Sequence, residues 1–252
     1  MQPDLAAAIE ELYAVFGRHP LAQRIDYCTH CVGEDEAMVL QRKRLRELAA
    51  SDLELFSRKA MSTWGDEADF RHFLPRILEL FATGELTHGY LFVKTMSNVR
   101  HYGTCWPADE VKAVEEYMIT LWRRTLSERE PILRAAEILE GAAANDHSIA
   151  PYLAIWAEDT GEPAAMHLAE FMDELAWTYW QEDTLRRESR AWLHSGVPAR
   201  ILETAFLASG DPQAATWLGQ ALERLELLMD DAKEPDAPSL RPAHGHHVPL
   251  PY

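Results

Sequence analysis

Residues 51–81 read SDLELFSRKAMSTWGDEADFRHFLPRILELF and contain the signals of two consecutive helices. In the first half, apolar residues recur at spacings of three and four, which is the period of one helix face: Leu53, Phe56, Ala60 and Trp64. The segment from Ser51 to Glu54 has the spacing of a capping box, which predicts a helix start there. Gly65 and Asp66 then predict a break and a new helix, because glycine accepts left-handed backbone and aspartate accepts the first N–H groups.

The rest of the chain repeats this pattern, and no stretch alternates as a strand would. The sequence therefore predicts an all-α protein of short helices joined by polar turns. Stacked antiparallel helix pairs, like HEAT or armadillo arrays, are the first expectation, and a compact multi-helix domain is the alternative. No fixed repeat period decides between the two arrangements.

The second predicted helix has two different faces. One face is apolar and should lie in the core: Phe70, Phe73, Ile77 and Phe81. The other carries charged and polar side chains at offsets of three and four: Asp69, His72, Arg76 and Glu79. This face is interpreted either as a solvated surface with ion pairs or as a recognition site or active site, with Trp64, Asp66, Asp69, His72 and Arg76 as candidate binding residues. Pro75 should interrupt the helix, because it removes the N–H that would pair with the carbonyl of Arg71.

The pair Cys28 and Cys31, in Tyr27-Cys28-Thr29-His30-Cys31, is the most specific chemical signal. Two thiols at this spacing can bind one zinc ion, but a tetrahedral site needs two further ligands, and only distant His72, His101 and Cys105 offer themselves. A thiol redox role is a second interpretation, which expects a strand before the motif and a parallel sheet around it. Two buried or half-buried thiols that serve only as packing residues are the third interpretation.

Composition limits the partners and the compartment. The chain has 252 residues with 24 Lys and Arg against 41 Asp and Glu, so its formal charge is −17. This excess repels nucleic acid and favours a basic protein partner. No apolar run is long enough for a membrane span, the acidic N-terminus is unlike a signal peptide, and three cysteines are too few for a disulfide framework. A cytoplasmic protein is predicted.

Two segments complete the organisation of the chain. Residues 1–232 are predicted to form one helical domain, and residues 233–252 a tail with five prolines and three histidines, at His244, His246 and His247. The sequence contains no phosphate-binding loop, no dinucleotide-binding glycine motif, no nucleophile elbow and no H-E-x-x-H zinc motif.

The motifs carry a resemblance to one family. The chain resembles uncharacterised bacterial all-helical proteins in which a C-x-x-C segment precedes a TWGD-x-x-DF-x-HFLPR-like stretch and a later WP-x-x-E; here these are Cys28 and Cys31, Thr63 to Arg76, and Trp106 to Glu110. The resemblance covers the first half of the chain and implies a bacterial, cytosolic, helical protein without an established activity.

Three functions are consistent with the sequence. The first is a non-catalytic helical interaction protein that binds a basic partner, such as a toxin or a regulator, through its acidic surface. The second is a zinc-binding or thiol-redox module at Cys28 and Cys31, and the third is an enzyme with a site between Asp66 and Arg76.

Overall fold

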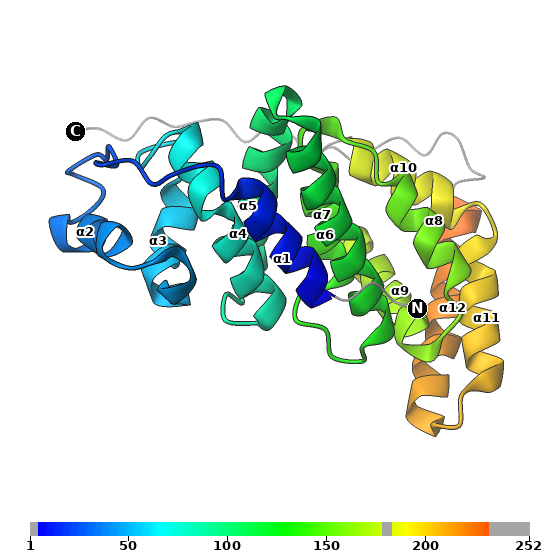
Figure 1. The fold of residues 1–252 in the computed structure, drawn as a ribbon. Helices are drawn as coiled ribbons and strands as arrows, with labels where there is room; N and C mark the ends of the chain where they lie inside the picture. Colours follow the sequence, from blue (N-terminus) through cyan, green and yellow to red (C-terminus); the bar gives the residue numbers. More distant parts are fainter. Residues whose placement is uncertain (1–4, 178–182, 232–252) are drawn as a thin grey trace, which may run out of the picture.

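Helices follow one another along an arc in this computed structural model, from α2 and α3 at one end to α11 and α12 at the other (Figure 1). The structure describes residues 5–177 and 183–231. The helices are α1 Leu5–Phe16, α2 Glu34–Arg42, α3 Ala50–Lys59, α4 Glu67–Thr83, α5 Gly89–Tyr102, α6 Ala108–Ser127, α7 Ala135–Ala143, α8 Ala150–Glu158, α9 Glu162–Trp177, α10 Thr184–Leu193, α11 Val197–Ala208 and α12 Pro212–Asp231. Three short 3-10 turns join them, and the described residues contain no strand. The all-α prediction is confirmed.

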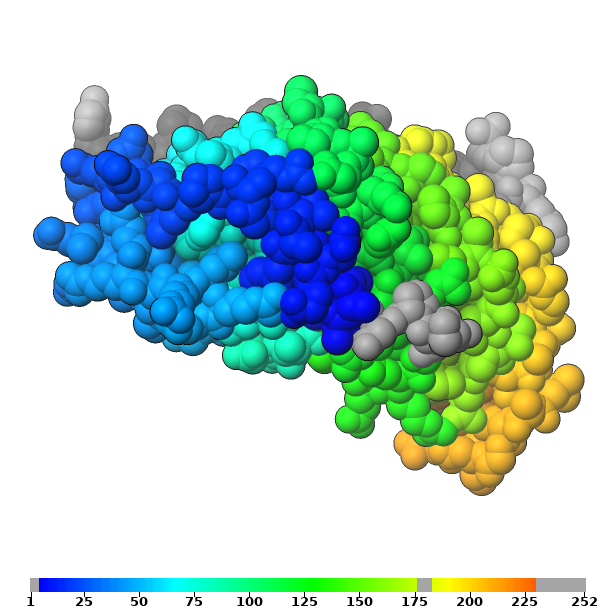
Figure 2. Space-filling model, viewed as in Figure 1, coloured from blue at the N-terminus to red at the C-terminus, as the bar shows by residue number. Residues whose placement is uncertain are grey.

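Long-range packing favours a compact domain over a strictly sequential stack. Helix α1 lies across α4 and α6, far along the chain, and covers them in both the ribbon and the space-filling views (Figures 1 and 2). In a sequential array each helix pair contacts only its neighbours in the chain. Because α1 crosses this order, the compact multi-helix alternative describes the domain. The predicted tail, with its three histidines, lies outside the described residues.

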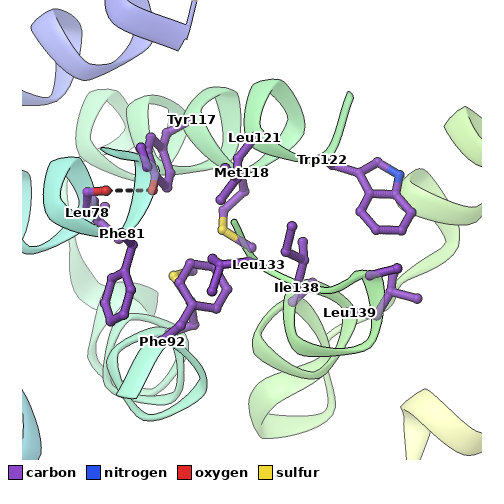
Figure 3. Close-up of a cluster of buried hydrophobic side chains, with 14 of the residues drawn as sticks. Leu78, Phe81, Phe92, Tyr117, Met118, Leu121, Trp122, Leu133, Ile138 and Leu139 are labelled. Atoms are coloured by element: carbon purple, nitrogen blue, oxygen red, sulfur yellow. Dashed lines mark hydrogen bonds between the residues drawn. The ribbon is translucent and has the colours of Figure 1, made fainter. Parts of the chain in front are cut away.

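The centre of the core lies between α4, α5, α6 and α7. Figure 3 shows the buried side chains that meet there, among them Phe81, Phe92, Met118 and Ile138. The hydroxyl of Tyr117 donates to the carbonyl oxygen of Leu78 over 2.7 Å, so this buried polar group is satisfied. A continuous hydrophobic cluster extends from α1 to α12 through this centre.

The two helices predicted in residues 51–81 are present, with a shifted first boundary. Helix α3 begins at Ala50, and its cap is made by Asp52, whose carboxylate accepts the N–H of Ala49 over 2.8 Å. The predicted capping box from Ser51 to Glu54 is therefore wrong. The helix begins earlier, because the carboxylate of Asp52 binds the free backbone N–H of Ala49 at the helix start. Helix α3 also ends at Lys59, so the buried Trp64 belongs to the connection and not to the helix.

The start of the second helix and its apolar face are confirmed. Gly65 has a φ of 70° and Asp66 caps α4, as predicted. The four predicted core residues, Phe70, Phe73, Ile77 and Phe81, are buried. The predicted interruption at Pro75 is wrong, since α4 continues through this buried proline to Thr83. Burial of the apolar side chains on both sides of Pro75 offsets the lost backbone hydrogen bond.

Candidate functional site

The C-x-x-C segment and the connection before α4 meet in the folded chain. Tyr27 and Trp64 form an isolated antiparallel bridge. Two backbone hydrogen bonds flank this bridge, from the N–H of Cys28 to the carbonyl of Thr63 over 2.8 Å and from the N–H of Gly65 to that of Asp26 over 2.7 Å. The two most specific sequence signals therefore belong to one site, which we call the thiol platform, residues 26–33 with residues 63–69.

Cys28 and Cys31 occupy a tight turn on this platform. The N–H groups of Cys31 and Val32 both donate to the carbonyl of Cys28, over 2.9 and 3.0 Å. Gly33 follows as the N-cap of α2, and its N–H is bound by the carboxylate of Glu36 over 2.8 Å. The turn is thus held on both sides, and it leaves Cys28 exposed and Cys31 half-buried.

The environment of Cys28 favours its thiolate. The backbone N–H of His30 contributes most to a lowered pKa of the Cys28 thiol, followed by the thiol and the N–H of Cys31 and by the charge of Lys59. Hydrogen bonds to the charged form stabilise that form. A larger fraction of Cys28 is therefore the reactive thiolate near neutral pH than for an ordinary cysteine.

The platform offers two sulfur donors for a metal and no more. Among residues 5–177 and 183–231, no group of three or more His, Cys, Asp or Glu side chains could hold a metal ion. His72, His101 and Cys105 therefore do not join Cys28 and Cys31 in such a group. A four-ligand zinc site needs donors beyond this described part of the chain.

Buried polar groups lie in and beside the platform. Trp64 is 1% exposed and packs edge-on against Phe56, with ring centroids 5.5 Å apart. The indole nitrogen of Trp64, Asp69 Oδ1, Thr63 Oγ1 and Ser57 Oγ are buried and find no hydrogen-bond partner within the described structure. Each such group costs about 1–3 kcal/mol, so the platform and its surroundings carry several unsatisfied polar groups.

Two of the predicted binding residues cap α4. Asp66 Oδ1 accepts the N–H of Asp69 over 3.0 Å, and Asp69 Oδ2 accepts the N–H of Asp66 over 3.1 Å. Asp69 is only 4% exposed. Burial is the main cause of a raised pKa at Asp69, and the charges of Asp66 and Asp26 act in the same direction.

The raised pKa of Asp69 predicts a pH dependence. Folding disfavours the ionised form of Asp69. Below the pKa of the unfolded chain the carboxyl is protonated in both states and does not lower the free energy of unfolding, and as the pH rises through the folded pKa the ionised form lowers it. Asp69→Asn removes this charge. The free energy of unfolding of the variant should therefore increase relative to that of the wild type between about pH 4 and pH 7. Urea unfolding at several pH values measures this.

Asp52 provides a control with the opposite sign. Burial opposes the lowering of its pKa, but Lys43 and the N–H of Ala49 bind its carboxylate and hold the pKa below the ordinary value. Asp52→Asn should therefore become more destabilising as the pH rises. Slopes of the same sign for the two variants would contradict one of the two assignments, and the sign shows which one.

His72 and Arg76, two further predicted binding residues, contact the backbone of segments that pack against α4. Nδ1 of His72 lies 2.8 Å from the carbonyl oxygen of His19, and Nε of Arg76 donates to that of Leu48 over 2.8 Å. Arg76 also pairs with Glu79 over 2.7 Å, and Tyr13 of α1 donates to the same carboxylate. This face is not a solvated surface, because α1 and the residues around 19 and 48 cover it, but the predicted intrahelical ion pair forms between Arg76 and Glu79. A ligand-binding role for these residues stays a prediction.

Sequence reasoning missed a buried ion pair beside this face. The carboxylate of Glu110 is fully buried and accepts two hydrogen bonds from Arg71, one of them from Nε over 3.0 Å. Nε2 of His19 lies 2.9 Å from the same carboxylate, and Arg71 lies over the ring of Trp106. Glu110 and Trp106 belong to the WP-x-x-E motif. The presence of this motif in the resemblance was the only sequence feature that pointed to these two residues.

Comparisons of the chain with models of protein families, with curated proteins and with solved structures find no match. The chain is an all-helical protein with a C-x-x-C pair, and the resemblance to a particular family stays a prediction. No helix among the described residues is long and apolar enough to cross a membrane.

Proposed function

We propose that Cys28 and Cys31 form a redox-active dithiol that exchanges with disulfide substrates in the cytoplasm. The observation that carries this proposal is the geometry of the turn, in which the N–H groups of Cys31 and Val32 bind the carbonyl of Cys28 and hold an exposed thiol beside a half-buried one. The lowered pKa of the Cys28 thiol, caused mainly by the backbone N–H of His30, supports the proposal. Attack on a disulfide requires a thiolate that the substrate can reach, and Cys28 combines both properties.

The two cysteines have different parts in the exchange. The Cys28 thiolate attacks one sulfur of the substrate disulfide, which breaks that bond, forms a mixed disulfide and releases the first substrate thiolate. The thiolate of the half-buried Cys31 then attacks Cys28 Sγ, forms the Cys28–Cys31 disulfide and releases the second substrate thiolate. Two protein thiols are oxidised, one disulfide is reduced to two thiols, and the two protons pass to the released thiolates.

The positions of the two cysteines on the platform support these different roles. Backbone hydrogen bonds to Thr63 and within the turn fix Cys28 and Cys31 on one short segment. The exposed position of Cys28 suits an external substrate, and the partial burial of Cys31 suits a resolving thiol that reacts within the chain. The described residues lack the strand and the parallel sheet that a redox role was expected to require. The turn's own N–H groups supply the thiolate stabilisation instead.

Two rival functions fit the platform less well. A zinc site has only two of its four donors within the described chain. A purely non-catalytic interaction protein leaves the lowered pKa of Cys28 without a role. The basic partner that the interaction hypothesis predicts stays an expectation for the substrate of the dithiol.

The test uses neutral 2-hydroxyethyl disulfide and single cysteine variants in the full chain. We expect Cys28→Ser to lower the rate of exchange about tenfold or more, because it removes the stabilised thiolate. Cys31→Ser should accumulate a mixed disulfide at Cys28, visible by mass spectrometry, since the resolving thiol is missing. The wild type should end with a Cys28–Cys31 disulfide.

Cys105 provides the matched control, because it is an exposed thiol outside the platform. Cys105→Ser should leave the exchange rate unchanged. If Cys105 reacts as fast as Cys28, or if no Cys28–Cys31 disulfide forms in the wild type, the proposed function is wrong.

A further inference from the structure

Acidic side chains surround the thiol platform. The exposed carboxylates that flank the two cysteines are Asp26, Glu34, Asp35, Glu36 and Asp66. The cationic side chains nearest along the same segments are Arg24, Arg58 and Lys59, and Arg58 is already paired with Glu54 over 2.8 Å. Carboxylates therefore outnumber cations around the dithiol, and Lys59 is the cation whose charge acts on the Cys28 thiol.

Chain geometry limits the distance between these acidic residues and the cysteines along the backbone. Asp26 precedes Cys28 by two residues, and Glu34 and Asp35 begin α2 three and four residues after Cys31. Three extended residues span at most about 10 Å, which is close to the Debye length at moderate salt. Asp66 lies on the other side, next to Gly65, whose N–H binds the carbonyl of Asp26.

The two acidic residues at the start of α2 are free to act on a substrate. Neither Glu34 nor Asp35 forms an ion pair with another described residue, whereas Glu36 is occupied at the N-cap of its own helix. Their charges are therefore not cancelled locally. The net charge of −17 adds a long-range field of the same sign.

We propose that the dithiol at Cys28 and Cys31 selects disulfides that carry positive charge, such as a cystine flanked by lysine or arginine in a basic peptide or protein. This inference rests on the proposed thiol–disulfide exchange and assigns its substrate class. The negative field raises the local concentration of a cationic disulfide and lowers that of an anionic one. The backbone N–H groups that favour the thiolate belong to the turn itself, so they act on Cys28 whatever the charge of the substrate.

The experiment compares three small disulfides of different charge. Cystamine carries two ammonium groups, 2-hydroxyethyl disulfide is neutral, and glutathione disulfide is anionic. Second-order rates with Cys28 are measured at 10 mM and at 1 M salt, and each is divided by the rate of free dithiothreitol with the same probe. We expect cystamine to exceed glutathione disulfide by about tenfold or more at low salt, and the preference to collapse at 1 M, where the Debye length is about 3 Å.

A matched pair of charge variants locates the effect. Glu34→Gln with Asp35→Asn removes two free carboxylates beside the platform. Glu223→Gln with Glu226→Gln removes two exposed carboxylates from α12, at the other end of the arc (Figure 1). Both double variants are compared with the wild type at about 0.1 M salt, where the Debye length is about 10 Å. The first double variant should reduce the cystamine preference about threefold, and the second should leave it unchanged, because screening at this salt confines the field of each carboxylate to its surroundings.

The outcomes separate the two proposals. If no probe forms the Cys28–Cys31 disulfide, the proposed function itself is wrong. If all three probes react with equal normalised rates, exchange stands and the charge selection is overturned. If the two double variants change the preference equally, the acidic residues at the start of α2 are not its source, and the assignment to this site is wrong.

Discussion

Replacing Glu110 by alanine is expected to lower the free energy of unfolding by about 3–5 kcal/mol, because it removes the close, buried partner of Arg71 and leaves only the more exposed Glu67, 3.6 Å away. The side chain of Arg71 is 17% exposed and that of Glu110 is 0% exposed, so water cannot replace the lost carboxylate at Arg71. His19 loses the same acceptor. Urea unfolding of the single variant measures the effect.

Two further variants test the cause of this loss. The neighbouring pair of Arg18 and Asp109 is exposed on both sides, so Asp109→Ala should cost less than about 1 kcal/mol. Replacing both buried partners, Arg71→Met with Glu110→Leu, should recover much of the stability, since no charge is then buried alone. A Glu110→Ala effect as small as that of Asp109→Ala would contradict the buried-charge explanation.

Replacing Trp156 by alanine is expected to destabilise the protein by about 3–5 kcal/mol through loss of buried area and creation of a cavity. The ring of Trp156 lies against Trp122, Phe171 and Trp192, with centroids 5.1, 5.7 and 5.2 Å away. Its indole N–H donates to the carbonyl of Ala164 over 3.0 Å. One side chain thus joins α8 to α6, α9 and α10.

Trp217 is the control for this substitution, because it is 44% exposed on α12. Trp217→Ala should change the free energy of unfolding by much less than Trp156→Ala, measured in the same denaturant titration. Similar losses for the two variants would show that Trp156 is not a central packing residue.

Local sequence patterns predicted the helices well and their exact ends less well. The spacing of Phe70, Phe73, Ile77 and Phe81 correctly gave the buried face of α4, since a helix period depends only on near neighbours. The start of α3 differed because Asp52 reaches the free N–H of Ala49. Pro75 was expected to break α4, but core packing on both sides of the proline keeps the helix continuous.

The candidate site was found in part. The spacing of Cys28 and Cys31 identified the thiols, and Asp66 was correctly placed before a helix. The same residues gave no sign that Cys28 binds Thr63 through the backbone. The polar face of α4 could not be recognised as covered, because the residues that contact His72 and Arg76 lie at positions 19 and 48.

The sequence by itself determined the helical class, the cap at Asp66, the pair of thiols and the acidic charge, because each depends on residue type and on spacings of a few residues. Only the tertiary structure decided that α1 crosses α4 and α6, that Glu110 is buried against Arg71, and that residues 26–28 bind residues 63–65. These contacts join residues 35 or more positions apart. These contacts depend on how whole helices pack into one core. A spacing of three or four residues carries no information about that packing.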